Sequence, residues 1–72
     1  MKAGDMVEFV WWSTYLAPGL IPDDMGRTVW HELSPGDRGI VVRAAEEDYI
    51  VVLFTTMDAL VKVHLSMLQI IE

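Results

Sequence analysis

The chain has 72 residues, 53% of them hydrophobic, with no cysteine and a formal net charge of −6. This length indicates one domain, residues 1–72, and the lack of cysteine excludes disulfides and thiolate metal ligands, so stability must come from a dense apolar core or from a core completed by another subunit. The acidic balance makes nucleic acid and anionic membranes unfavourable partners, because both attract basic surfaces.

The first strand is predicted over residues 6–12, after the turn-prone pair Gly4-Asp5. Successive side chains of a strand point to opposite faces. Val7, Phe9 and Trp11 therefore form the predicted core face, because Glu8 belongs to the other set.

Residues 13–37 are predicted to form a long irregular loop. Pro18-Gly19, Pro22-Asp23-Asp24 and Pro35-Gly36-Asp37 punctuate this segment, and only residues 27–33 are β-prone within it. A loop of this length in a small domain is usually functional or mobile.

Four further strands are predicted over residues 38–45, 49–55, 59–65 and 67–71. The core face of residues 38–45 is ambiguous, and residues 49–55 are apolar on both faces. In the last two strands the predicted inward residues are Val61, Val63, Leu65, Leu68 and Ile70. An amphipathic helix over residues 60–71 is the alternative; the central Ser66, which suggests a short 3₁₀ turn, and the dense β-branched residues disfavour it.

Three sequence patterns resemble those of small SH3-like barrels. They are Gly4-Asp5-x-Val7-x-Phe9, then Pro35-Gly36-Asp37-x-Gly39-Ile40-Val41, then Leu65-Ser66-x-Leu68-x-Ile70. The resemblance extends to KOW-type domains and to the photosystem I accessory subunit family. It implies an all-β, five-stranded SH3-like barrel with a long irregular loop after the first strand. It implies no shared function, because both families carry basic residues where they meet their partners and this chain is acidic.

Catalytic and metal sites find little support in the sequence. His31 and Glu32 are adjacent and would point to opposite faces of a strand, and His64 lies too far along the chain for a standard zinc spacing. The serines lie in no nucleophile motif, and no glycine-rich phosphate loop is present. We therefore expect no enzyme, no cofactor, no metal and no small-molecule substrate.

Aromatic residues in or beside the predicted loop are the first candidates for binding: Trp11, Trp12, Tyr15 and Trp30. Tryptophan and tyrosine are favoured at the centres of protein interfaces. In the alternative interpretation, Trp11 belongs to the core, and Trp12 and Trp30 only cover one end of the barrel.

A surplus of apolar residues at predicted outward positions is the second candidate. Its members are Met6, Val10, Trp12, Val51, Leu53, Leu60 and Ile71. A contiguous exposed patch of such residues marks an interface. The alternatives are a wrong face assignment or a loop folded over this surface. Leu53 and Leu60 join the four aromatic residues as candidate binding residues.

The sequence thus predicts a non-enzymatic protein-interaction module that associates with itself, and its acidic turns favour a basic partner surface. A KOW-like nucleic-acid or ribosome-associated factor is the second hypothesis, and a small metal-binding or enzymatic subunit is the third. Residues 1–5 show no signal-peptide pattern, and the longest apolar run, residues 50–54, is too short to span a bilayer. We expect a cytoplasmic protein.

Overall fold

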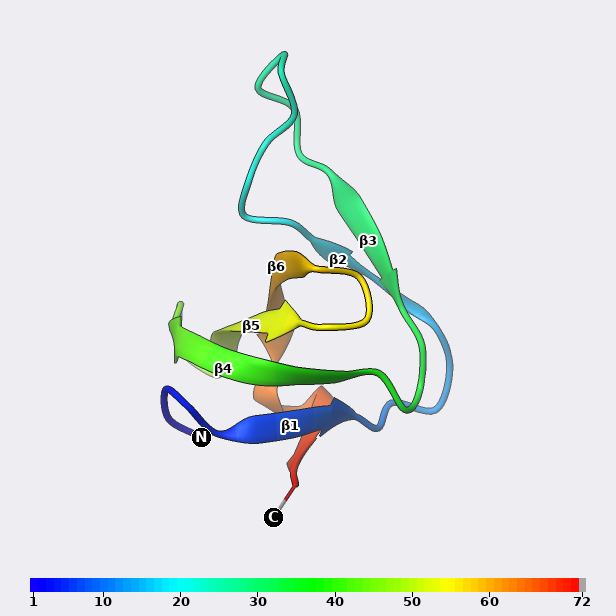
Figure 1. The fold of residues 1–72 in the computed structure, drawn as a ribbon, viewed down its shortest axis with the longest axis vertical. Coiled ribbons are helices and arrows are strands. Elements are labelled where there is room, and N and C mark those ends of the chain that lie inside the picture. The colour runs from blue at the N-terminus through cyan, green and yellow to red at the C-terminus, as the bar shows by residue number, and fades with distance from the viewer. Residues whose placement is uncertain (72) are drawn as a thin grey trace.

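The computed structural model describes residues 1–71, which form seven strands and one 3₁₀ turn without an α-helix (Figure 1). In chain order these are β1 (Met6–Phe9), β2 (Tyr15–Pro18), β3 (Trp30–Leu33), β4 (Arg38–Ala44), β5 (Tyr49–Phe54), β6 (Ala59–His64), the turn η1 (Leu65–Met67) and β7 (Leu68–Ile70). The prediction of an all-β chain is confirmed, and the alternative helix over residues 60–71 does not form. No helix among these residues is long and apolar enough to traverse a bilayer.

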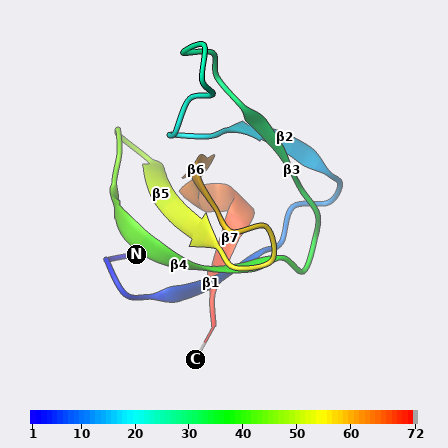
Figure 2. The same ribbon diagram turned by 45° about the horizontal axis from the view of Figure 1, so that its top comes forward.

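The strands form two antiparallel sheets. The larger has five strands in the order β6-β5-β4-β1-β7, and the smaller is the hairpin β2-β3. One bridge, between Gly19 and Val61, connects the hairpin to the edge strand β6, and beside it Leu20 N–H donates to the Leu60 carbonyl at 3.0 Å. Figure 2 shows the hairpin lying across one end of the curved larger sheet. The two sheets do not close into a barrel.

The core lies on the concave face of the larger sheet, where the hairpin adds two residues. Its members are Val7, Phe9, Ala17, Leu33, Val41, Ile50, Val52, Phe54, Val61, Val63 and Leu68. Two predicted inward residues, Leu65 and Ile70, are instead 41% and 44% exposed. Leu65 leaves the strand alternation because it begins η1, and Ile70 lies on the edge strand β7 with no neighbour on its other side.

Part of the segment predicted as irregular is ordered as the hairpin β2-β3. Pro18 does not interrupt this hairpin, because it occupies a position opposite Trp30 where no ladder hydrogen bond is required. The next residue, Gly19, donates its N–H to the Val29 carbonyl at 2.8 Å. The proline therefore removes a donor that the ladder does not use, and the alternation of Leu16 (exposed) with Ala17 (buried) is that of a strand.

An irregularity in β4 determines which residues of this strand face the core, which the sequence left ambiguous. The register with β5 shifts between Val41 and Arg43, as in a β-bulge. Val41 is buried in the core, whereas Val42 is 41% exposed. The prediction that Val51 would be an exposed outward residue is wrong. It is only 1% exposed, because its register partners on the two neighbouring strands are the long side chains of Arg43 and Lys62.

Candidate protein interaction surface

An apolar row crosses the outer face of the larger sheet. The strand registers place Met6 opposite Ile40, Ile40 opposite Leu53, and Leu53 opposite Leu60. The row, which we call the sheet row, therefore runs over β1, β4, β5 and β6. Met6 is 49% and Ile40 37% exposed, and Leu53 and Leu60 are half-buried. Side chains directly opposite one another in a sheet lie within contact distance, so the row is contiguous.

Cations stand on both sides of the sheet row on the same face. Arg38 pairs with Glu8 (Nε to Oε1, 3.4 Å), and Lys62 pairs with Glu46 (Nζ to Oε1, 2.8 Å). Lys62 Nζ also lies 5.4 Å from the centroid of the Tyr49 ring, within range of a cation–π interaction. Arg43 has no carboxylate partner among residues 1–71.

The charge of the outer face is opposite in sign to that of the chain. Strands β1, β4, β5 and β6 contain three cations, Arg38, Arg43 and Lys62, and one carboxylate, Glu8; with Glu46, which pairs with Lys62, the face has a net charge of +1. The remaining residues carry two cations and nine carboxylates, or −7. The acidic excess is thus confined to turns, the hairpin and the termini, and the sheet row lies on a mildly basic surface.

A shallow pocket of about 250 Å³ opens at the Leu60 end of the row. Ile21 and Val29, from the two ends of the loop that joins β2 to β3, line it together with His31. The turn before β6 supplies Asp58 and Ala59. The apolar surface of the row therefore continues towards the base of the hairpin loop.

The four candidate aromatic residues do not form a single groove. Trp11 and Tyr15 are half-buried and pack against the core, whereas Trp12 is 81% exposed, its ring centroid 6.3 Å from that of Trp11. Trp30, 58% exposed, lies opposite Pro18 on the outer face of the hairpin, at the other end from Tyr15. Among the six candidates the structure brings together Trp11 with Trp12 and, as register partners, Leu53 with Leu60.

Each of the two histidines contacts neighbouring residues of its own chain. His64 Nδ1 accepts a hydrogen bond from the Ser66 backbone N–H at 3.1 Å and lies 2.8 Å from its hydroxyl, so this ring caps η1. His31 lies against Gly19, where an added Cβ would come within 2.9 Å of His31 Nε2. Within residues 1–71, no three His, Asp or Glu side chains gather as a metal site would require.

Sequence reasoning missed three residues that the structure makes prominent. Ile40 stands in the middle of the sheet row, and Ile21 and Met25 are 67% and 76% exposed in the loop between β2 and β3. The sequence left the face of Ile40 open, and the structure decides it: Gly39 and Val41 are buried on the inner face, so Ile40 lies on the outer one. No pattern in the sequence distinguishes the exposure of Ile21 or Met25 from burial under a loop.

Comparisons of this chain with protein-family models, curated proteins and solved structures find no match.

Proposed function

We propose that this protein is a non-enzymatic interaction module, an open variant of the SH3-like barrel, that associates with further copies of itself through the outer face of its sheet. The strand order β6-β5-β4-β1-β7 and the 3₁₀ turn before the last strand support the SH3-like assignment. The observation that carries the function is the sheet row: a partly exposed apolar band that crosses four strands. Such a band favours association, because binding removes it from water.

The charge distribution supports a second copy as the occupant. The face around the sheet row, with Glu46 included, has a net charge of +1, and the rest of the same chain has −7. An acidic part of one copy is therefore complementary to the basic apolar face of another. The ion pairs Arg38–Glu8 and Lys62–Glu46 leave Arg43 as the cation most available to a partner.

Sedimentation velocity from about 1 to 100 μM tests the proposal. The natural chain should sediment above the 8.2 kDa monomer, with a mass that rises with concentration. Ile40→Lys places a charge in the middle of the row and should weaken association at least tenfold, because each copy then buries a charge. Leu65→Lys is the matched control: Leu65 is similarly exposed but outside the row, and association should persist. A natural chain that remains monomeric over the whole range contradicts the proposal.

A KOW-like nucleic-acid factor is the second candidate, supported by the three cations that share the outer face: Arg38, Arg43 and Lys62. Two of them are already paired with carboxylates, which weakens their attraction for phosphate. Fluorescence anisotropy with a labelled single-stranded RNA at 50 and 200 mM salt separates the candidates. Binding that falls steeply with salt and is lost in Arg43→Glu supports the nucleic-acid factor. No binding at either salt concentration contradicts it.

A further inference from the structure

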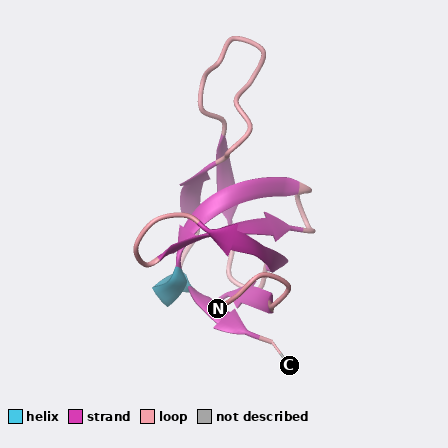
Figure 3. Cartoon of the chain, turned by 90° about the vertical axis from the view of Figure 1, so that its left-hand side faces the viewer, coloured by secondary structure: helices cyan, strands magenta, loops and turns pink. Residues whose placement is uncertain are grey.

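The tip of the loop between β2 and β3 stands clear of the rest of the molecule. Figure 3 shows it as a narrow extension at one end, and the molecule measures 38 Å along its longest axis against 23 and 21 Å along the others. Ile21 is 67% and Met25 76% exposed on this loop. Ile21 still lines the pocket beside Leu60, whereas Met25, at the tip, contributes little to the fold of its own chain and is available to a partner.

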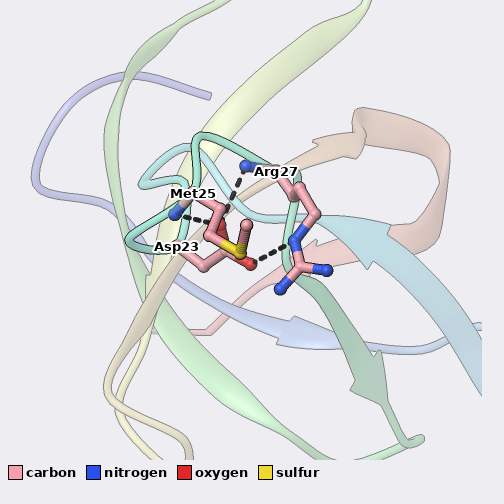
Figure 4. Close-up of polar contacts among 3 residues, drawn as sticks. All are labelled: Asp23, Met25 and Arg27. Carbon is pink, nitrogen blue, oxygen red and sulfur yellow. Dashed lines mark hydrogen bonds and ion pairs between the residues drawn. The ribbon is translucent and has the colours of Figure 1, made fainter.

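Asp23 holds the tip of the loop in one conformation. Its Oδ1 accepts hydrogen bonds from the backbone N–H groups of Met25 and Arg27, both at 2.9 Å, and Arg27 Nε donates to its Oδ2 at 3.0 Å (Figure 4). The backbone closes the same turn, with Asp23 N–H donating to the Arg27 carbonyl and Gly26 N–H to the Asp23 carbonyl. Met25 is thus presented on an ordered turn, which lowers the entropy cost of binding.

The charges of tip and sheet favour one way of joining two copies. Two sheet faces in contact would place Arg43 of each copy near the cations of the other. Within the tip Asp23 is already paired with Arg27, which leaves Asp24 as the excess negative charge. Two tips in contact would bring the two Asp24 carboxylates together, whereas a tip against a sheet face places Asp24 beside the cations and Met25 on the sheet row. Methionine suits an irregular apolar surface, because its side chain is unbranched and flexible.

From these observations we infer that the copies join head to tail: the loop tip, with Met25 at its centre, docks on the sheet row of the next copy. This rests on the proposed self-association and specifies its mode. Each chain then carries one donor tip and one acceptor face, so the interface is heterologous. Such an interface does not stop at a dimer, and growth continues until the copies close into a ring or extend as a filament.

Two variants that each lose one surface test the inference. Met25→Lys disables the tip, and Ile40→Lys disables the face. Each variant alone should sediment as a monomer. An equimolar mixture should form a heterodimer of twice the 8.2 kDa chain mass and nothing larger, because the intact face of the first variant receives the intact tip of the second. Met25→Leu keeps an apolar tip and should assemble like the natural chain. Far-ultraviolet circular dichroism verifies folding, and Met25→Ser with Ile40→Gln repeats the experiment should either lysine variant fail to fold.

The outcomes distinguish the head-to-tail mode from the proposed self-association on which it rests. Association that survives Met25→Lys but not Ile40→Lys, with no heterodimer in the mixture, overturns the head-to-tail mode and leaves self-association through the sheet in place. A natural chain that is monomeric throughout overturns both. Loss of assembly in both variants, with recovery of a heterodimer on mixing, establishes the head-to-tail mode.

Discussion

The five-stranded sheet and the hairpin β2-β3 are stabilised in different ways. Ten of the twelve buried hydrophobic residues belong to the larger sheet, and the hairpin contributes only Ala17 and Leu33. Beyond those two residues the half-buried Tyr15 packs against the core, Gly19 and Leu20 connect the hairpin to β6, and the hydrogen bonds of Asp23 order its loop. Burial thus governs the stability of the sheet, and local hydrogen bonds govern the shape of the loop. In this way a small domain can display an apolar tip without using buried core residues to hold it.

The largest expected loss of stability comes from truncating Phe54, a fully buried residue in the core of the larger sheet. Phe54→Ala should cost about 3–5 kcal/mol, much of the stability of a domain this small, because it removes a ring from close packing. Leu53→Ala changes the adjacent residue on the outer face and should cost clearly less. Urea denaturation at concentrations where the chain is monomeric measures both. Equal losses would show that the outer face is packed as tightly as the core and would contradict the division described here.

Glycine substitutions probe the two regions through backbone contacts. An added Cβ at Gly39, in β4, would lie 2.6 Å from the Leu53 carbonyl oxygen and 2.7 Å from Val52 Cγ1. Gly39→Ala should therefore force two strands apart and cost about 1–3 kcal/mol in urea denaturation. At Gly19 the nearest atoms are His31 Nε2 and the Val29 carbonyl oxygen, both 2.9 Å away and both in or beside the hairpin.

Gly19→Ala should accordingly loosen the hairpin from β6 with a smaller loss of global stability. Hydrogen exchange followed by mass spectrometry distinguishes the two results. Protection should fall over residues 15–33 in Gly19→Ala and across the whole sheet in Gly39→Ala. Uniform loss of protection in both variants would show that hairpin and sheet unfold as one unit.

The adjacent tryptophans after β1 provide a smaller contrast. Trp11 packs against the core, and Trp12 is 81% exposed. Trp12→Ser should change the free energy of unfolding by no more than about 0.5 kcal/mol, whereas Trp11→Ser should cost at least about 1 kcal/mol. Acrylamide quenching of the fluorescence in Trp11→Phe and Trp12→Phe shows which ring is accessible. A destabilising Trp12→Ser variant would place that ring in an intramolecular contact.

The sequence predicted the sheet well because its elements follow two-residue alternation. Val7 and Phe9, like Val61 and Val63, lie on the core face as expected. The alternation fails where the backbone departs from it: at the β4 bulge, where Val42 is exposed, and at η1, which turns Leu65 outward. The 3₁₀ turn was indicated by Ser66, although Leu65 was still expected to face inward. The β4 bulge leaves no local mark in the residue pattern, since it depends on how neighbouring strands pair.

The hairpin and the sheet row were harder to predict for a different reason. From the sequence alone, Pro18 indicates a break in a strand, because proline has no backbone N–H to donate. The register of β2 with β3 shows that no donor is needed at this position. Leu53 and Leu60 were identified as outward apolar residues, but their continuity with Met6 through Ile40 requires the order of four strands. That order joins residues distant in sequence, and a single chain's pattern does not encode it directly.

The smallest and most local expected effect concerns the loop tip at Asp23. The hydrogen bond from the Arg27 backbone N–H is the main cause that lowers the pKa of this carboxyl below its ordinary value. The Met25 N–H and the Arg27 side chain add to it, and desolvation opposes it. A carboxyl whose pKa is lower in the folded state contributes stability above its unfolded pKa and loses it as the pH falls through the folded pKa. The tip should therefore stay ordered at neutral pH and loosen only as the pH falls below 3.8, the ordinary pKa of an aspartate.

NMR titration of the Met25 and Arg27 amide protons measures this directly, since both donate to the carboxylate that titrates. Their midpoint should fall below that of Asp23 in a free peptide covering residues 21–28. Asp23→Asn removes the charge, and should abolish the titration and speed amide exchange at the tip while leaving the urea midpoint of the whole domain unchanged. Asp24→Asn, with no hydrogen bond to either amide, is the matched control and should preserve the titration. If the Asp23→Asn variant instead lowers the urea midpoint, the tip is coupled to the core, and the independence of the two regions is lost.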